Sequence, residues 1–159
     1  MGVSGSGKTT IGKKLSEKTG IPFFDADEFH SEVNKEKMKA GKPLTDNDRT
    51  EWLTRMNQLA KEQMKKKGAI IACSALKEKY RMVLSEGINI PVFWVFLQGN
   101  YELILKRMQA RKDHYMQPSM LSSQFDILET PLQCITIDIS ESPDEIVKTI
   151  ISRIGEFSQ

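Results

Sequence analysis

The sequence predicts an α/β fold in which a parallel β-sheet lies between two layers of helices. Two observations lead to this prediction. Short apolar runs alternate with stretches whose apolar residues recur at helical spacing, and polar residues follow the apolar runs. In folds of this class, ligands bind beyond the carboxyl ends of the strands. We therefore expect a single domain over residues 1–159, with its site at that edge of the sheet.

Four apolar runs are the predicted strands of this sheet. They are Ile21–Phe24, Ala69–Cys73, Pro91–Leu97 and Cys134–Ile139. Runs that are apolar throughout are typical of strands covered on both faces. Helices on both sides of the sheet would provide that cover, although the order of the strands cannot be read from the sequence.

The predicted helices lie between and after these strands. They are Thr9–Lys18, a helix with an inward stripe from Trp52 to Met64, Lys77–Ser85, Tyr101–Arg111, Met120–Leu128 and Asp144–Ile154. The first carries Ile11 and Leu15 on its inner face and ends at Gly20. Either Asp46 or Thr45 can cap the helix that contains the stripe.

Composition limits the partners and the compartment. Lys and Arg number 23 against 21 Asp and Glu, a net charge of +2 that is too small to predict a nucleic-acid partner. The two cysteines cannot form a disulfide framework, which favours buried thiols and the cytoplasm. No apolar segment approaches the roughly 20 residues of a membrane span, so we expect no membrane partner.

The segment GVSGSGKTT, residues 2–10, contains the complete phosphate-loop pattern G-x-x-x-x-G-K-[ST]. Its glycines let successive N–H groups point at phosphate oxygens, and the helix that follows adds its positive amino end. The lysine can reach the β and γ phosphates, and the threonine hydroxyl can bind Mg2+. The predicted nucleotide-binding residues are Gly2, Ser4, Gly5, Ser6, Gly7, Lys8, Thr9 and Thr10, and Thr9 is also a predicted metal ligand.

Two other interpretations use the same residues. The segment could be a Gly- and Ser-rich mobile terminus without a ligand. Residues 1–6 also fit the pattern M-G-x-x-x-[ST] for N-myristoylation. An acyl chain on Gly2 would crowd the phosphate loop, and one such chain anchors a protein only marginally.

Asp25 and Asp27 directly follow a predicted strand. On an extended segment they share a face, aimed at the place where Mg2+ and an acceptor hydroxyl would meet. The alternative is a turn in which one of them caps the next helix. With only His30 and His114 in the chain, a clustered His/Cys metal site cannot form, so Mg2+ held by oxygens is the expected ion.

Several cations are candidates for binding anionic groups. Arg49 could pair with the neighbouring aspartates on the surface or reach inward toward a carboxylate. Lys77 and Arg81 are four residues apart and could bind an anionic acceptor together. Arg107 and Arg111 have the same spacing, and Arg111 enters a polar break suited to a lid over the phosphates, at about residues 111–125.

Five segments together resemble the gluconate kinases, which are part of the shikimate-kinase-like group of P-loop kinases. They are GVSGSGKTT, FFDADEFH, KMKAGKPLTDNDRTEWL, CSALKEKYR and RKDHYMQPSMLSSQFDILETP, and the resemblance runs from Gly2 to about Pro131. It implies a three-layer P-loop NTPase fold with a mobile lid, and a homodimer. It also implies ATP-dependent phosphorylation of the 6-hydroxyl of D-gluconate to 6-phosphogluconate.

The resemblance also implies roles for individual residues. Lys8 and Thr9 would hold the nucleotide phosphates and Mg2+, and Asp25 would support the magnesium shell through water. Asp27 would bind gluconate hydroxyls and accept the proton. The remaining contacts would come from Arg49, Lys77 and Arg81 on the sugar acid, from Arg107 and Arg111 at the lid and adenine side, and from His114 in the lid. Lys8, Asp27 and Arg111 are thus the expected catalytic residues.

Only Met1 precedes the phosphate loop. Members of the family that the chain resembles have an apolar strand ahead of the motif, in the middle of the sheet. Losing that strand would cost several kcal/mol against a total stability of about 5 to 15 kcal/mol. A start site placed too late, a short isoform or a start at an internal methionine would each explain the pattern. We expect the active form to carry additional residues before Met1, and this chain to fold poorly or have weak activity.

Three functions share the phosphate loop and remain to be separated. Besides a gluconate kinase, the chain could be another small-molecule kinase such as a shikimate kinase, or a nucleotide-binding protein with little activity. A switch GTPase usually carries the guanine-binding motif N-K-x-D, whereas residues 34–37 read N-K-E-K. The segment DNDRTEWL favours the sugar acid as the acceptor.

Overall fold

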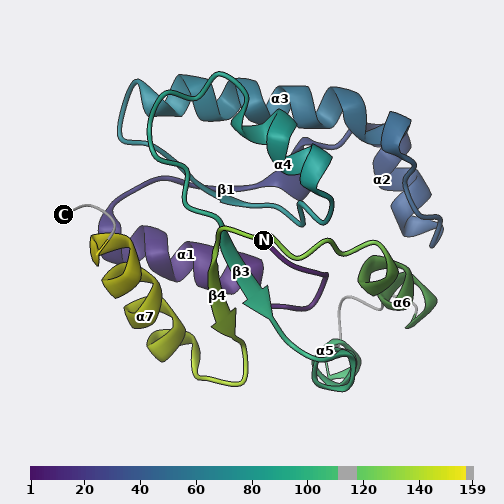
Figure 1. Ribbon diagram of the computed structural model, residues 1–159. Helices are drawn as coiled ribbons and strands as arrows, with labels where there is room; N and C mark the ends of the chain where they lie inside the picture. The colour runs from purple at the N-terminus through teal and green to yellow at the C-terminus, as the bar shows by residue number, and fades with distance from the viewer. Residues whose placement is uncertain (111–117, 157–159) are drawn as a thin grey trace.

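The structure of the chain, a computed structural model, describes residues 1–110 and 118–156 (Figure 1). The elements in chain order are α1 (Lys8–Thr19), β1 (Phe23–Asp25), the 3-10 turn η1 (Ala26–Phe29), α2 (Glu32–Lys39), α3 (Asp46–Met64), β2 (Ile70–Ala72), α4 (Glu78–Ser85), β3 (Val95–Gln98), α5 (Tyr101–Gln109), α6 (Pro118–Asp126), β4 (Ile135–Asp138) and α7 (Pro143–Glu156). The alternation of strands and helices confirms the predicted α/β fold.

The strands form two parallel pairs. Strand β1 pairs with β2 in the register Phe23↔Ile70, and β3 pairs with β4 in the register Val95↔Ile135. Within the described ranges, each pair is a separate two-stranded sheet, and β2 and β3 are not paired with each other. The sheet that the sequence predicts is therefore present as two halves.

The first two residues lie between these halves. The Leu97 N–H donates to the Met1 carbonyl at 3.0 Å, and the Gly2 N–H donates to the Ser74 carbonyl at 3.2 Å. The Met1 amino group donates to the Val95 carbonyl. Figure 1 shows the N-terminus between β1 and β3. These bonds fix the start of the phosphate loop at the carboxyl ends of β2 and β3.

Helices cover both sides of the strands, as expected. Helices α1 and α7 pack together on one face, and α3 and α4 pack together on the other (Figure 1). Successive residues of β3 point to opposite faces, so Leu97 joins the core beneath α1 and Phe96 joins the core beneath α3. These two cores hold the layers in place around the site.

Two of the observed strands differ in length from the predicted ones. The predicted strand Pro91–Leu97 is regular only from Val95, and the predicted strand Ala69–Cys73 only over Ile70–Ala72. An apolar run adopts regular strand geometry where a neighbouring strand accepts and donates its main-chain hydrogen bonds. The Trp94 carbonyl accepts from the Ile135 N–H of β4 at 2.8 Å, and regular strand geometry begins at the next residue, Val95.

Most predicted helices are confirmed, with small shifts at their ends. In α1, Ile11 and Leu15 are buried, and Gly20 ends the helix with a φ of 70°. Thr45 rather than Asp46 caps α3, in a capping box with Asp48. The predicted helix to Arg111 is α5, which ends at Gln109. Among the described residues, no helix combines the length and apolar character needed to cross a membrane.

Candidate active site

The phosphate loop folds into a shape that requires its glycines. Gly5 and Gly7 have φ angles of 82° and 97°, in the left-handed region that favours glycine. A Cβ on Gly5 would lie 2.7 Å from the Met108 Cγ, so a side chain there would also collide with α5. Gly7 is the N-cap of α1 and offers no side chain to cap the first amides of that helix. Main-chain N–H groups at the start of α1 are therefore available to an anion.

Lys8 follows this loop and folds back over it. Its Nζ donates to the carbonyls of Gly2 and Val3, both at 3.0 Å. The ammonium therefore lies against the backbone of the loop that would surround the phosphates. Ser6 lies in the same turn with its hydroxyl buried and without a hydrogen-bond partner among the described residues.

The two predicted metal ligands meet at the amino end of α1. The Thr9 hydroxyl donates to Asp25 Oδ2 at 2.7 Å, although the two residues come from different elements. Asp25 Oδ1 accepts from the Asp27 N–H at 3.2 Å, so this carboxylate also caps η1. The structure thus shows the capping turn that the sequence left as one alternative, and the metal and acceptor roles of this aspartate pair stay predictions.

This pair of oxygens fits Mg2+ better than a softer metal. Mg2+ binds hydroxyl and carboxylate oxygens and keeps several waters, so two protein oxygens suffice. Within the described ranges, no group of three or more His, Cys, Asp or Glu side chains could form a richer metal site.

Asp27 lies beyond the end of β1 with an exposed side chain, in η1. Helix α3 fixes this turn, because the Trp52 indole N–H donates to the Ala26 carbonyl at 2.7 Å. The His30 ring stacks on Trp52 with centroids 4.4 Å apart, and its Nε2 lies 4.0 Å from Asp27 Oδ1. Burial, followed by the charges of Arg49 and Lys35, lowers the pKa of His30 to about 4. His30 is therefore neutral at neutral pH.

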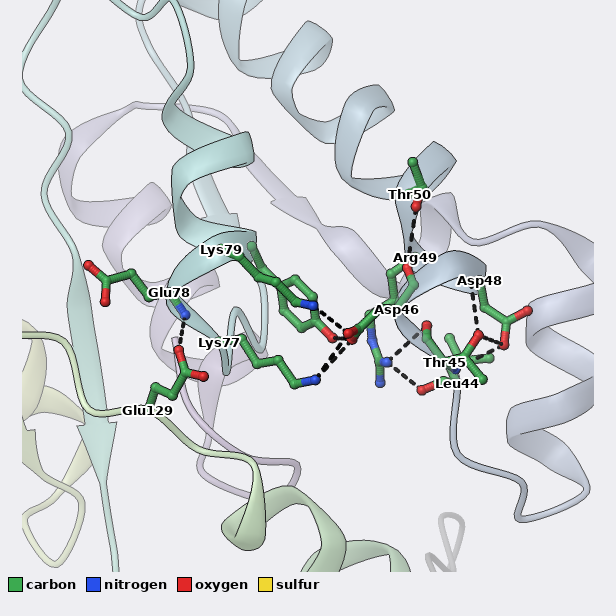
Figure 2. A network of polar contacts seen from close by, with 11 residues as sticks. Leu44, Thr45, Asp46, Asp48, Arg49, Thr50, Lys77, Glu78, Lys79 and Glu129 are labelled. Atoms are coloured by element: carbon green, nitrogen blue, oxygen red, sulfur yellow. Dashed lines mark hydrogen bonds and ion pairs between the residues drawn. The ribbon is translucent and has the colours of Figure 1, made fainter.

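A cluster of cations surrounds Asp46 at the start of α3 (Figure 2). Asp46 accepts from Lys77 Nζ at 3.0 and 3.3 Å, and also from Lys79 Nζ and the Tyr80 hydroxyl. The hydrogen bonds from Lys79, Tyr80 and Lys77 hold the pKa of the Asp46 carboxyl well below its usual range. Lys77, a predicted substrate contact, is thus paired with a carboxylate of the protein itself.

Arg49 lies beside this cluster. Its guanidinium donates to the carbonyls of Leu44 and Thr45 and lies 5.6 Å from the centre of the Tyr80 ring. The neighbouring Asp48 instead accepts from Lys37 at 2.6 Å. Surface pairing of Arg49 with the adjacent aspartates, one of the two alternatives, is therefore not among the described contacts.

Two other predicted cations bind the main chain. Arg81 is buried and donates to the carbonyls of Ala75 at 2.9 Å and Leu76 at 3.3 Å. Arg107 donates to the Ile139 carbonyl at 2.6 Å. In this state both arginines hold loops at the carboxyl ends of strands, and their ligand contacts stay predictions. Arg111 and His114 lie outside the described residues, as does the first part of the predicted lid.

Gln124 of α6 contacts the phosphate loop, and sequence reasoning missed this contact. Its Oε1 accepts from the Ser4 N–H at 2.7 Å, and its Nε2 donates to the Ser4 hydroxyl at 3.1 Å. The contact joins the range predicted as the lid to the phosphate loop. Asp46 was considered only as a helix cap, and its role in the cation cluster was also missed. Neither residue belongs to a local pattern that would have marked it.

The chain is similar to proteins of known name over most of its length. A family model described as shikimate kinase matches residues 4–155. A probable gluconokinase of Dictyostelium discoideum is 47% identical over 165 residues, which cover 96% of this chain and 82% of that relative. The thermosensitive gluconokinase of Escherichia coli (strain K12) is 46% identical over 132 residues, covering 82% and 70%.

A solved structure of a gluconokinase is also similar to this chain. The crystal structure of a gluconokinase from Sinorhizobium meliloti 1021 superposes with a TM-score of 0.89 at 34% identity, covering 99% of this chain and 90% of that one. The family match begins inside the phosphate loop and ends in α7, so it includes every strand described above.

Proposed function

The chain belongs to the gluconokinases of the shikimate kinase family, and on that premise we propose that it transfers the γ-phosphoryl group of ATP to D-gluconate. The acceptor is the 6-hydroxyl, and the products are 6-phospho-D-gluconate and ADP. The observation that carries the proposal is the bond between Thr9 of the phosphate loop and Asp25 at the end of β1. It joins the nucleotide side of the site to the strand end from which Asp27 projects.

The protein's task in phosphoryl transfer is to position the reactants and neutralise charge. The amides at the start of α1, which no side chain caps, and the ammonium of Lys8, which lies against the loop carbonyls, would bind the phosphates. Thr9 would bind Mg2+ directly and Asp25 would bind it through water. When bound, the ion would supply positive charge that stabilises the transferred phosphoryl group.

The acceptor hydroxyl would lie against Asp27. This carboxylate is exposed and is held by η1 at the end of β1, so it can accept a hydrogen bond from the 6-hydroxyl and then its proton. The His30 ring is buried against Trp52, whereas the Asp27 carboxylate is exposed, which favours Asp27 as the proton acceptor. Arg111 and Arg107, from the lid and α5, would add positive charge on the nucleotide side.

The gluconate carboxylate needs a cation, and three candidates lie near the start of α3 and α4. Arg49, Lys77 and Arg81 are the proposed contacts, and His114 would approach from the lid. Lys77 is paired with Asp46 in the structure, so gluconate would take over a cation that an internal carboxylate now neutralises. In such an exchange the partly exposed Lys77 ammonium has an anionic partner in both states.

An assay of ADP release with three acceptor conditions tests the proposed reaction. We expect ADP to form with gluconate and far more slowly with shikimate or with no acceptor, and 6-phosphogluconate to be the product. Equal rates with shikimate would assign a broader small-molecule kinase. Equal ADP release without any acceptor would contradict the kinase assignment and leave a nucleotide-binding protein. The variant Asp27→Asn provides a matched control, since it should bind ATP and fail to transfer.

The proposal includes a homodimer in the cytoplasm. The resemblance to gluconate kinases supports the dimer, and both cysteines are free thiols, which agrees with a reducing compartment. Sedimentation velocity at several protein concentrations tests the first part, with a monomer at all concentrations as the contrary result.

A further inference from the structure

Helix α4 is capped by a residue from a distant part of the chain. Its N-cap residue is Lys77, whose side chain makes no capping hydrogen bond. The first amides of a helix have no partner within the helix, so they need an acceptor from elsewhere. Glu129 provides one, because its Oε2 accepts from the Glu78 N–H at 2.5 Å (Figure 2). The start of α4 is therefore fixed by the segment that follows α6.

Glu129 also binds the carbonyl that precedes Lys77. The Glu129 N–H donates to the Leu76 carbonyl at 2.8 Å, and the same carbonyl accepts from the Arg81 guanidinium at 3.3 Å. Lys77 thus lies between two main-chain groups, the Leu76 carbonyl and the Glu78 amide, that both bind Glu129. Two bonds from one residue, one on each side of Lys77, fix the main chain from which its side chain extends.

The position of this main chain determines where the Lys77 ammonium can reach. The Lys77 side chain extends from the start of α4 to Asp46, with its Nζ 3.0 Å from Asp46 Oδ1 (Figure 2). Under the proposed function, Lys77 exchanges this carboxylate for that of gluconate. A cation whose main chain is already fixed loses less conformational entropy when it binds an anion. A fixed start of α4 therefore favours the exchange.

The bond between Glu129 and α4 is a charge-assisted hydrogen bond at the positive end of a helix. Both Glu129 and Glu78 are exposed, so solvent screens the charge and the bond adds little to the stability of the whole protein. Its main consequence is local, since it sets the place from which Lys77 extends.

Glu129 and Gln124 contact opposite sides of the site. Gln124 binds Ser4 of the phosphate loop, and Glu129, five residues later, binds the start of α4. The end of α6 and the residues after it therefore contact both the nucleotide side and the acceptor side, each through a different residue. The two contacts can be removed one at a time.

We propose that Glu129 is a positioning residue of the acceptor side, which holds Lys77 in place for the carboxylate of the sugar acid. This inference rests on the proposed function, in which Lys77 binds that carboxylate. Glu129 acts through its bonds to Leu76 and Glu78, and not through a contact with the substrate.

Steady-state kinetics of three variants test this role. Glu129→Ala removes the acceptor and should raise the KM for gluconate about fivefold, with kcat and the KM for ATP within about twofold of the unchanged enzyme. Glu129→Gln keeps an oxygen that can accept from the Glu78 N–H, so its KM for gluconate should stay within about twofold. Asp126→Ala is the matched control, because it removes an exposed carboxylate of α6 that makes no bond to α4 among the described contacts.

A second set of measurements asks whether Glu129 acts through Lys77. In the Lys77→Met background, Glu129→Ala should raise the KM for gluconate by less than about twofold, since the side chain that it positions is absent. Hydrogen exchange provides a readout that does not depend on activity. The Glu78 amide should exchange about tenfold faster in Glu129→Ala than in the unchanged enzyme.

Several results would overturn the proposal. A KM for gluconate that is the same in Glu129→Ala and Asp126→Ala would do so, as would equal increases in Glu129→Ala and Glu129→Gln. An equal rise in the KM for ATP would indicate a general structural role instead. A fivefold increase that persists in the Lys77→Met background, or unchanged exchange of the Glu78 amide, would also contradict it.

Failure of this inference can be told apart from failure of the proposed function. If the unchanged enzyme forms 6-phosphogluconate and any of these contrary results is found, only the role of Glu129 is wrong. If the unchanged enzyme forms no 6-phosphogluconate, the proposed function is wrong, and the role of Glu129 toward gluconate is wrong with it.

Discussion

The nucleotide side of the site consists mainly of main chain, whereas the acceptor side consists mainly of side chains. The nucleotide side consists mainly of backbone in one contiguous segment, with Gly5 and Gly7 in left-handed conformations and the first amides of α1 open to an anion. The acceptor side consists of long charged side chains from α3 and α4. There Asp46 binds Lys77, Lys79 and Tyr80 (Figure 2).

This difference indicates how each side binds its ligand. A cradle of main-chain amides needs no rearrangement, because glycine geometry and the helix terminus fix its donors in advance. A cation that is already paired must exchange one carboxylate for another, so its net gain on binding is smaller. We therefore expect substitutions on the nucleotide side to have the larger effects and those on the acceptor side to act mainly on gluconate affinity.

The most severe test of the comparison is Lys8→Met. It removes the one side-chain charge of the cradle, and we expect kcat to fall by about 1,000-fold, since the ammonium stabilises charge that develops on the transferred phosphoryl group. Steady-state kinetics measure the effect. The matched control is Lys13→Met, an exposed lysine of the same helix, which should retain activity. A kcat within tenfold of the unchanged enzyme would remove Lys8 from the catalytic residues.

A pair of substitutions divides the acceptor side. Lys77 and Lys79 both bind Asp46, but only Lys77 is a proposed substrate contact. We expect Lys77→Met to raise the KM for gluconate by about 10- to 100-fold, the loss of a hydrogen bond to a charged group, with the KM for ATP unchanged. Lys79→Met should change the KM for gluconate by less than about threefold. Equal effects of the two substitutions would mean that the cluster acts only through Asp46.

A smaller effect is expected where α6 meets the phosphate loop. Gln124→Ala removes two hydrogen bonds to Ser4 and should raise the KM for ATP by about fivefold, the effect of a neutral hydrogen bond. Ser123→Ala is the control, because the Ser123 hydroxyl donates to the Met120 carbonyl within α6 and, among the described contacts, not to the phosphate loop. If both variants have the KM of the unchanged enzyme, α6 does not support the cradle.

The smallest expected effect is on the pH dependence of the free energy of unfolding, to which His30 contributes. The pKa of His30 is lowered from 6.5 to about 4, so the unfolded chain binds a proton that the folded protein does not. The contribution of His30 is therefore fully present above about pH 6.5 and is lost as the pH falls toward about 4. Denaturant unfolding of His30→Asn should show a shallower decline in this range.

The decline at still lower pH should be unaffected by that substitution. Hydrogen bonds from Lys37 and Thr45 lower the pKa of Asp48 from 3.8 to about 2, so its contribution is lost only below the ordinary range of the carboxyl group. An identical pH profile for the His30→Asn variant between pH 6.5 and 4 would show that His30 does not titrate with folding.

The nucleotide side could be predicted from sequence because its residues are contiguous and its chemistry depends on backbone conformation. The pattern from Gly2 to Thr9 fixes the loop, and the apolar run before Asp25 places that carboxylate at a strand end. The meeting of Thr9 and Asp25 followed from these two local features and from the rule for parallel sheets.

The acceptor side could not be predicted in the same way, because its contacts depend on tertiary packing. Asp46 reads as a helix cap in the sequence, and only the packing of α3 on α4 brings it to Lys77. Arg81 was predicted to contact the substrate, yet it is buried and donates to the carbonyl of Ala75, a residue with a φ of 45°. The length of β3 could also not be predicted from the sequence, because regular strand structure needs a neighbouring strand as well as apolar residues.

Calorimetric titration of a non-hydrolysable ATP analogue tests the central claim most directly, namely that residues 2–9 form a ready cradle for Mg2+ and nucleotide. The account predicts binding heat without gluconate that requires Mg2+, is abolished by Lys8→Met and persists in Lys77→Met. Binding that is independent of Mg2+ and unchanged by Lys8→Met, or no binding until gluconate is added, would contradict it.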